Sequence, residues 1–503
     1  MSVNNSTTIG RIETGVGNLD AVLGGGLPER SVTVIAGPPG SGKTTLSHQI
    51  GFHAAGKGVK SLYFQTLGEP TAKRLQYLSQ FSYFDTAKFE TSVRFVDLGV
   101  LIRSEGIDSV IGLIMEHIKR EKPALVVIDS FKAFGDLLIS QEQSRKFNYE
   151  LIIHLIAWEC TALLLGEYSD EDFRNNPLFS VIDGVITMTQ KEVSGEQLRM
   201  LRAVKMRGTA HNRDHHPFLI DSDGIQLFAP RVLIRRTSHN RKGSAVQERC
   251  MTGIRDLDSL LSDGIPRGTS MLVAGMTGTG KTVLLLNFIY EGATQFGEKG
   301  IIFSFDETQD KLYLAAHELG WDLEDLVDRG LVEIVFIPQP EVLVEEHLLV
   351  IKDRAEAMGA KRIALDSLSG FLCKIDTPQL VREKVYQLAT IVQNLSAIGF
   401  FSSEVPYGSN QMSRFGIEET MLDGIIFLSL AAEGRQRKRF LEIYKLRHTE
   451  HQLGQHPVMI GRGGFKIATA AADRRAQQKN PKNVPKEKTH VRKKKASQKK
   501  RVK

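Results

Sequence analysis

Two short glycine-rich stretches have the residue types and spacing of a phosphate-binding loop. "GPPGSGKT" occupies residues 37–44 and "GMTGTGKT" residues 275–282. In this pattern the glycines let backbone N–H groups turn toward phosphates, the lysine reaches the β- and γ-phosphates, and the last hydroxyl ligates Mg²⁺. The sequence therefore predicts two sites for ATP and Mg²⁺, built from Gly37, Gly40, Gly42, Lys43, Thr44 and Thr45 in the first and from Gly275, Gly278, Gly280, Lys281 and Thr282 in the second.

Each phosphate loop is followed, further along the chain, by an apolar stretch that ends in aspartate. These stretches are "ALVVIDS", which contains Asp129, and "KRIALDS", which contains Asp366. An aspartate at such a strand end holds Mg²⁺, usually through water, beside the phosphate loop. We therefore expect one magnesium site at Thr44 and Asp129 and another at Thr282 and Asp366.

Hydrolysis also requires a carboxylate that orients or deprotonates the attacking water. "FSFDET" offers Asp306 and Glu307 at the end of a strand that we expect next to the phosphate loop, whereas the matching "QTLGEP" has Gly68 and keeps only Glu69. An alternative role for "DET" is a helix N-terminal cap, where acids and threonine are favoured. We expect both sites to bind nucleotide and the second to retain the more complete catalytic set.

Two Lys-x-Arg pairs, Lys205 with Arg207 and Lys445 with Arg447, provide candidate cations for phosphate. Side chains alternate along a strand, so both members of a pair lie on the same face. Such cations neutralise charge on a γ-phosphate, as an arginine finger does, or they are solvated strand charges. Their occurrence in both halves of the chain favours the catalytic role.

The chain is an internal duplication. Lys281 follows Lys43 by 238 residues, and Asp366 follows Asp129 by 237. Each copy alternates apolar strands with amphipathic helices, which predicts an α/β fold with a mainly parallel sheet covered on both faces. We expect two tandem P-loop ATPase domains, with the first over 1–235, a linker over 236–248, the second over 249–471 and a tail over 472–503.

The excess of positive over negative charge in this chain lies in the tail. The net charge is +7, but residues 473–503 contain 14 Lys and Arg against 2 Asp and Glu, so they carry +12 and the rest carries −5. This polar, aromatic-free segment is expected to be disordered. It either binds nucleic acid, an anionic membrane or an acidic partner, or is a solvated tail, whereas the acidic body makes nucleic acid an unfavourable partner for the core.

The remaining composition indicates a cytoplasmic protein without a membrane span. No run of 18 apolar residues occurs, and the first residues, "MSVNNSTTIGRIETG", contain no hydrophobic signal region. The three cysteines are scattered without metal-like spacing, which suits a reducing compartment.

The duplicated phosphate loop, "ET" or "DET" segment, "IDS" or "LDS" strand and terminal K-[ML]-R strand resemble the KaiC-like family of circadian-clock ATPases, within the RecA-like hexameric ATPases. The likeness extends over about residues 10–468 in both halves. It implies RecA-like domains in a double-ring homohexamer with ATP at subunit boundaries. One subunit would supply the phosphate loops, and its neighbour would supply Lys205 with Arg207 and Lys445 with Arg447.

The resemblance also assigns further residues. The family's paired catalytic glutamates correspond to Asp306 and Glu307, and only in part to Gly68 and Glu69. The clock protein has a phosphorylated Ser-Thr pair four and three residues before an aspartate. Here "FGIEETMLDG" has Glu419 and Thr420 at those positions, so Thr420 is the phosphoacceptor candidate if the chain autophosphorylates, and "GIEET" is otherwise a structural strand entry.

We therefore expect a KaiC-like hexameric ATPase that acts as a regulatory switch with an unidentified protein partner, and the resemblance adds serine/threonine autokinase activity. Two alternatives share the fold. One is a RecA- or helicase-like motor that DNA stimulates, against which the acidic body argues. The other is a nucleotide-gated scaffold with negligible turnover.

Overall fold

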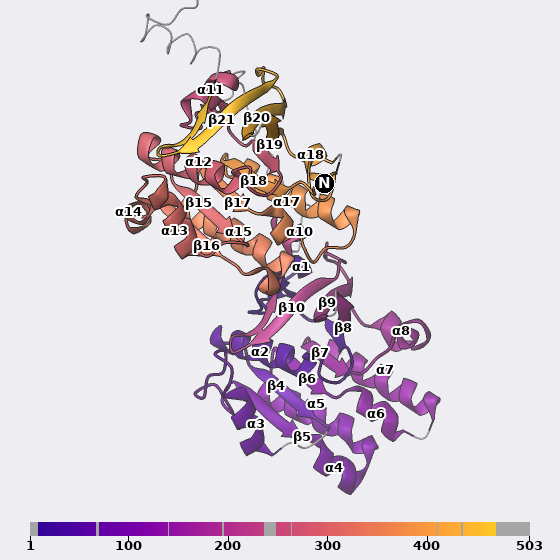
Figure 1. Cartoon of the computed structure of the whole chain (residues 1–503). Coiled ribbons are helices and arrows are strands. Elements are labelled where there is room, and N and C mark those ends of the chain that lie inside the picture. The colour runs from indigo at the N-terminus through magenta and orange to yellow at the C-terminus, as the bar shows by residue number, and fades with distance from the viewer. Residues whose placement is uncertain are drawn as a thin grey trace, which may run out of the picture. The chain divides into compact units, whose positions relative to one another are not determined.

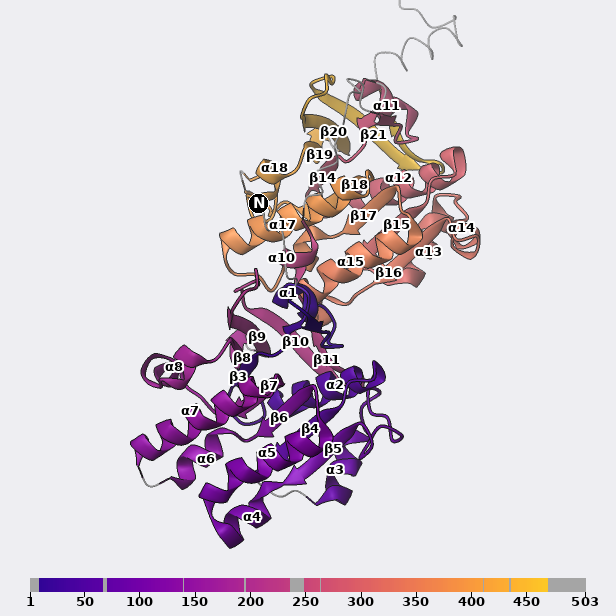
Figure 2. The same ribbon diagram turned by 180° about the vertical axis from the view of Figure 1, so that it is seen from behind.

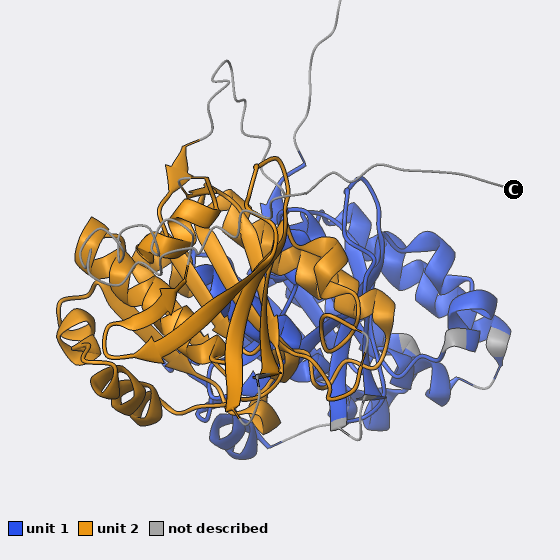
Figure 3. Ribbon diagram, turned by 45° about the horizontal axis from the view of Figure 1, so that its top comes forward, with its two compact units in different colours: residues 1–237, 343–353 blue, residues 238–342, 354–503 orange. Residues whose placement is uncertain are grey.

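The computed structural model describes residues 9–66, 70–138, 140–193, 196–235, 248–262, 264–409, 411–433 and 436–468. The chain divides into two compact units, residues 1–237 with 343–353 and residues 238–342 with 354–503 (Figure 3). Of the linker expected over 236–248 only Glu248 is described, and the tail expected over 472–503 lies outside the described residues. The expected domain boundaries therefore stay a prediction.

The first domain is built on a nine-stranded sheet in the order β11-β10-β9-β8-β3-β7-β6-β4-β5. Strands β8, β3, β7, β6, β4 and β5 pair in parallel, and β9 to β11 extend the sheet in antiparallel fashion. A separate pair joins β1 to β2. The strands are β1 (Arg11–Ile12), β2 (Leu27–Pro28), β3 (Val32–Ala36), β4 (Ser61–Gln65), β5 (Val93–Asp97), β6 (Leu125–Asp129), β7 (Thr161–Gly166), β8 (Gly184–Val193), β9 (Glu196–Met206), β10 (His216–Asp221) and β11 (Gly224–Leu227).

Helices cover both faces of this sheet, as Figures 1 and 2 show. Alternate side chains of β3 belong to two different cores: Ile35 to the one that contains Leu46 of α2, and Val34 to the one that contains Ile114 of α5. Apolar residues therefore occupy both faces of the strand, with Thr33 as its one polar residue. The helices are α1 (Leu19–Leu23), α2 (Lys43–Gly56), α3 (Thr71–Leu78), α4 (Leu98–Glu105), α5 (Val110–Glu121), α6 (Lys132–Leu137), α7 (Gln141–Ala157), α8 (Asp170–Asn175), α9 (Leu178–Val181) and α10 (Pro230–Leu233).

The second domain repeats this plan, with a sheet in the order β16-β15-β17-β18-β14-β19-β20-β21-β22 and a small β12-β13 pair. The strands are β12 (Arg249–Cys250), β13 (Ile265–Pro266), β14 (Ser270–Gly275), β15 (Gly300–Ser304), β16 (Val332–Phe336), β17 (Arg362–Asp366), β18 (Ile398–Glu404), β19 (Gly424–Glu433), β20 (Gln436–Leu446), β21 (Gln455–Gly461) and β22 (Gly464–Ile467). The helices are α11 (Arg255–Leu260), α12 (Lys281–Phe296), α13 (Gln309–Glu318), α14 (Leu323–Asp328), α15 (Val344–Met358), α16 (Leu368–Phe371), α17 (Pro378–Asn394) and α18 (Glu418–Met421).

The predicted fold class, two tandem α/β domains of the RecA-like type, is confirmed. In each domain the central parallel strand leads directly into a phosphate loop and then a long helix: β3 into α2, and β14 into α12. No helix in the described parts of the chain is both long enough and apolar enough to cross a bilayer.

Candidate functional site

The second phosphate loop leaves β14 after Gly275 and ends where α12 begins at Lys281. Gly280, the residue before the helix, has φ 103°, a conformation that favours glycine. The Lys281 ammonium donates hydrogen bonds to the backbone oxygens of Gly275 at 2.9 Å and Met276 at 3.2 Å. Burial lowers the pKa of Lys281, against the opposing charges of Glu404 first and then Asp366. The loop therefore forms a cradle with the lysine held inside it.

The expected magnesium residues of the second domain are in direct contact. Thr282 Oγ1 donates to Asp366 Oδ2 at 2.6 Å, and Ser402 Oγ donates to Asp366 Oδ1. Asp366 is only 5% exposed, and this burial raises its pKa. A hydroxyl and a carboxylate beside a phosphate loop are the oxygen donors that Mg²⁺ takes, so the residues present fit the ion.

Asp306 and Glu307 reach this site from β15, which is not the neighbour of the phosphate-loop strand. The expectation that the two strands adjoin is wrong, because β17 and β18 lie between β15 and β14. Ser304 at the end of β15 pairs with Asp366 at the end of β17, and this register brings the carboxylates to the magnesium residues.

The two carboxylates have different surroundings. Asp306 accepts hydrogen bonds from Ser367 Oγ at 2.7 Å and from Gln339 Nε2. The Glu307 carboxylate accepts none from the described residues, and burial, followed by the charge of Asp366, raises its pKa. Thr308 is the N-cap of α13, and no side chain caps that helix end, which disfavours the capping role for "DET". Asp306 is held in place, whereas Glu307 is available to accept a proton.

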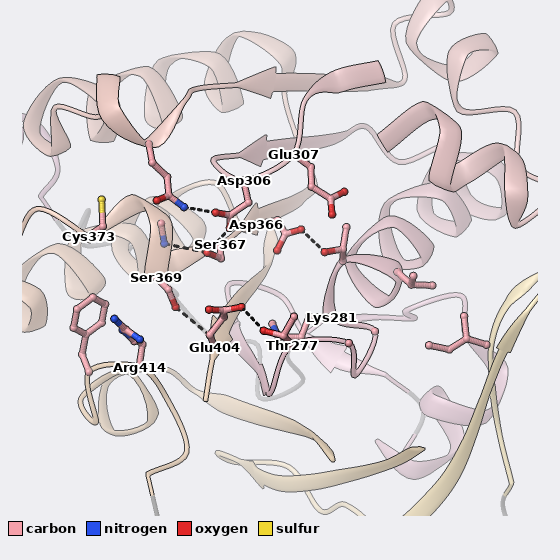
Figure 4. Close-up of a pocket in the computed structure, with 18 of the residues that line it drawn as sticks. Thr277, Lys281, Asp306, Glu307, Asp366, Ser367, Ser369, Cys373, Glu404 and Arg414 are labelled. Atoms are coloured by element: carbon pink, nitrogen blue, oxygen red, sulfur yellow. Dashed lines mark hydrogen bonds between the residues drawn. The ribbon is translucent and has the colours of Figure 1, made fainter. Parts of the chain in front are cut away.

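These groups surround a cavity of about 740 Å³ (Figure 4). Thr277 Oγ1 in the phosphate loop donates to Glu404 Oε1 at 2.9 Å, and Arg439 of β20 donates to the backbone oxygen of Gly278 at 3.3 Å. The sequence analysis assigned no role to Glu404, and it did not identify the other lining residues: Gln339, Ser367, Ser369, Cys373, Arg414, Phe415 and Arg439.

The first domain repeats the binding half of this site. Lys43 donates to the backbone oxygens of Gly37 at 2.8 Å and Pro38 at 2.9 Å, and Thr44 Oγ1 donates to Asp129 Oδ2 at 2.7 Å. Burial lowers the pKa of Lys43. Gly40 and Gly42 have φ 72° and 99°, and Thr45 lies in the first turn of α2. Gly68 and Glu69 lie outside the described residues, so the role of Glu69 stays a prediction.

The Lys-x-Arg pairs lie at the edge of each sheet where the central parallel strand begins. The phosphate loop of the same domain lies at the opposite edge, where that strand ends. Lys445 of β20 pairs with Ile425 of β19, which pairs with Leu272 near the start of β14. Lys205 pairs with Val185, which pairs with Val34 of β3. The loops leave from the other ends of β14 and β3. The pairs therefore point away from the nucleotide site of their own domain.

Each pair binds the backbone of a short helix at that edge. Lys445 donates to the oxygens of Glu419 at 2.9 Å and Leu422 at 2.8 Å, and Arg447 donates to that of Thr420 at 2.9 Å. The first domain has the same pattern, in which Lys205 and Arg207 bond the oxygens of Phe179, Ser180, Val181 and Ile182.

The phosphoacceptor candidate belongs to that edge as well. Thr420 lies in α18, its side chain is exposed, and its Oγ1 donates to the backbone oxygen of Ile417 at 2.7 Å. It is therefore remote from the phosphate loop of its own domain.

Comparison with known proteins finds relatives over nearly the whole chain. The family model described as "ATPase: KaiC" matches residues 12–232 and 250–472. The circadian clock oscillator protein KaiC of Picosynechococcus is 27% identical over 93% of this chain and 91% of its own length. That of Rippkaea orientalis is 26% identical over 92% and 89%, and the circadian clock protein KaiC3 of Synechocystis is 26% identical over 91% and 92%.

Proposed function

The chain belongs to the KaiC family of ATPases, and we propose that it hydrolyses Mg-ATP in a homohexamer whose nucleotide sites lie between neighbouring subunits. The observation that carries the proposal is the position of Lys445 with Arg447, and of Lys205 with Arg207, at the sheet edge opposite their own phosphate loops. Such a cation meets a γ-phosphate only if another copy presents its loop to it. Repeated head-to-tail contacts of this kind form a ring when the rotation from one subunit to the next closes on itself.

The residues of the second site divide the work. Gly275, Gly278, Gly280 and Lys281 bind the phosphates, and Thr282 with Asp366 hold Mg²⁺, which neutralises phosphate charge. Glu307 takes the proton of the attacking water. Asp306, which Ser367 and Gln339 hold in place, orients the attacking water. The cations that stabilise charge in the transition state come from the adjacent subunit.

The first site binds nucleotide through the same parts, with Glu69 as its carboxylate. Gly37, Gly40, Gly42, Lys43 and the first-turn Thr45 bind the phosphates. Thr44 and Asp129 hold the metal ion, as their contact at 2.7 Å supports.

We extend the proposal to a cytoplasmic regulatory switch that answers to a protein partner, with autokinase activity at Thr420. The exposed side chain of Thr420 supports access by a second copy. The basic tail over 472–503 is proposed as an electrostatic tether for acidic partners or nucleic acid.

The test combines sizing with turnover. The full chain with saturating Mg-ATP should form a hexamer by light scattering and release phosphate, and the Lys43→Ala/Lys281→Ala double variant should do neither. A monomer in Mg-ATP would contradict the shared sites. Stimulation by single-stranded DNA that is lost in high salt would favour the motor instead. A hexamer without phosphate release would favour the scaffold.

A further inference from the structure

A buried glutamate in the second domain has no part in the reaction described above. Glu418 opens α18 and is 0% exposed. Its Oε1 accepts a hydrogen bond from Ser403 Oγ at 3.0 Å, and its Oε2 accepts from Ser413 Oγ at 2.7 Å and from the Ile417 N–H at 3.1 Å. A buried carboxyl group is costly unless such donors surround it. The buried Glu418 carboxyl group therefore has hydrogen-bond donors at both of its oxygens.

From Glu418 the hydrogen bonds run back to the phosphate loop. Ser403 Oγ lies 3.4 Å from Ser369 Oγ, which also accepts from the backbone N–H of Glu404 at 3.1 Å. The Glu404 carboxylate in turn accepts from Thr277 Oγ1 in the loop. Figure 4 shows the part of this series of hydrogen bonds that joins Thr277, Glu404 and Ser369.

In the other direction the bonds reach the cation pair. Ser413 Oγ also lies within hydrogen-bond distance of the Glu419 carboxylate, so its single proton is shared between the Glu418 and Glu419 carboxylates. The backbone oxygens of Glu419 and Thr420 accept from Lys445 and Arg447 respectively. Helix α18 thus links the Glu418 carboxyl group, at its first residue, to the two cations that bind its backbone oxygens.

We propose that Glu418 is a positioning residue that couples the phosphate loop of the second domain to Lys445 and Arg447, so that nucleotide bound in one subunit changes the cations offered to the next. The inference rests on the proposed shared sites. Phosphates in the loop bring negative charge beside the Glu404 carboxylate, and like charges repel. A shift of Glu404 alters the bonds of Ser369 and Ser403. Because Glu418 is packed and fully bonded, α18 responds by moving as a unit.

The first domain lacks this connection. With Asp183 aligned to Asp423, Leu178 and Phe179 stand where the second domain has Glu418 and Glu419, and Gly166 stands in place of Ser403. Phe179 packs edge-on against Tyr168 and Phe173, with ring centroids 5.2 Å and 4.7 Å apart. An apolar cluster therefore occupies the position of the polar chain, which confines the coupling to the second domain.

The test uses the full chain with Lys43→Ala, which disables the first nucleotide site so that turnover reports on the second domain. In this background it compares Glu418→Gln, Arg447→Ala and their combination. Glu418→Gln keeps the size of the side chain and removes its charge. We expect it to lower kcat roughly 2-fold to 30-fold, the range of measured coupling effects, and to reduce the cooperativity of turnover with ATP concentration. Because it acts through Lys445 and Arg447, it should lower kcat by a smaller factor in the Arg447→Ala variant than in the parent. Leu178→Met, at the matching place in the first domain, serves as the control and should change neither kcat nor the cooperativity of turnover.

The outcomes separate the coupling from a structural role. Additive losses in the double variant, or unchanged kcat and cooperativity in Glu418→Gln, would overturn the coupling. A parent protein that assembles and turns over confirms that the proposed function itself stands in either case. A parent without turnover in Mg-ATP would overturn the proposed function and the coupling together.

Discussion

The Oγ1 of Thr282 lies 2.6 Å from the Oδ2 of Asp366, and Thr44 and Asp129 repeat this relationship at 2.7 Å. Each contact joins the first turn of the helix after the phosphate loop to the end of a strand more than 80 residues further along the chain. The duplicated domains have kept the same oxygen pair at the place where we propose a metal ion. Differences in activity between them must therefore arise elsewhere, in the carboxylates and in the segments around the cations.

Asp366→Asn should stabilise the empty protein while abolishing turnover in the second domain. Burial raises the pKa of Asp366 above its ordinary value of 3.8, so the folded state favours the protonated form and its ionised form costs stability at neutral pH. Asparagine resembles the protonated form. We expect a melting temperature a few degrees higher in EDTA, at about 2–4 °C per kcal/mol for a domain of this size.

The sign of this effect is open to a direct check. As the pH falls through the raised pKa, Asp366 of the parent becomes protonated and the parent gains stability. The difference in melting temperature between parent and variant should therefore become smaller. Thermal unfolding at several pH values measures it. A variant that melts below the parent at neutral pH would contradict the electrostatic cost.

The two domains should hydrolyse ATP unequally. Glu307→Gln is expected to remove more of the steady-state rate than Glu69→Gln, because Glu307 has Asp306 beside it whereas Glu69 follows Gly68. Loss of a positioned base costs about 10²-fold to 10⁴-fold at its own site. Phosphate release by the two single variants, each with the other domain intact, compares the domains, and equal residual rates would refute the asymmetry.

Turnover in the second domain should fail in acid at a higher pH than an ordinary glutamate would give. Glu307 must be ionised to accept a proton, and burial together with Asp366 raises its pKa above 4.5, while Lys311 lowers it. In a Lys43→Ala background, Lys311→Ala should move the acid limb of kcat/KM to still higher pH. An acid limb that stays in place when Lys311 is removed would argue against Glu307 as the base.

Subunits that carry complementary defects should restore each other. Lys281→Ala lacks the phosphate lysine and Arg447→Ala lacks the cation, both in the Lys43→Ala background, so neither alone has an intact second site. In randomly mixed rings about a quarter of the interfaces join an intact loop to an intact cation. Phosphate release should recover to about that fraction of the parent. No recovery in verified mixed hexamers would place the cation and the loop in the same subunit.

The local chemistry of this protein could be predicted from sequence, because its residues are close together. A phosphate loop lies within eight residues, and the apolar strand before Asp366 is continuous, so spacing alone identified both. The duplicated pattern likewise predicted the two parallel sheets. The expected neighbour of the phosphate-loop strand was wrong, since strand order in a parallel sheet depends on crossovers that local pattern does not encode.

Relationships between distant residues could not be predicted in the same way. Alternation along a strand places Lys445 and Arg447 on one face, but it does not say at which edge of the sheet they lie. That follows from the antiparallel pairing of β20 with β19. Glu418 was missed for a similar reason, because its donor Ser403 lies 15 residues earlier, near the end of β18.

Thr420 is expected to accept phosphate from a neighbouring subunit if the chain autophosphorylates. Its backbone oxygen bonds Arg447 at the sheet edge opposite its own phosphate loop, and its side chain is exposed. Glu419, where the clock family has serine, offers no hydroxyl, so Thr420→Ala should abolish incorporation of label from γ-labelled ATP. Mixing Thr420→Ala subunits with Lys281→Ala subunits should restore label only on the Lys281→Ala chains, which mass spectrometry distinguishes. Label that persists in Thr420→Ala alone would place the acceptor elsewhere, and an unlabelled parent would leave this chain an ATPase without kinase activity.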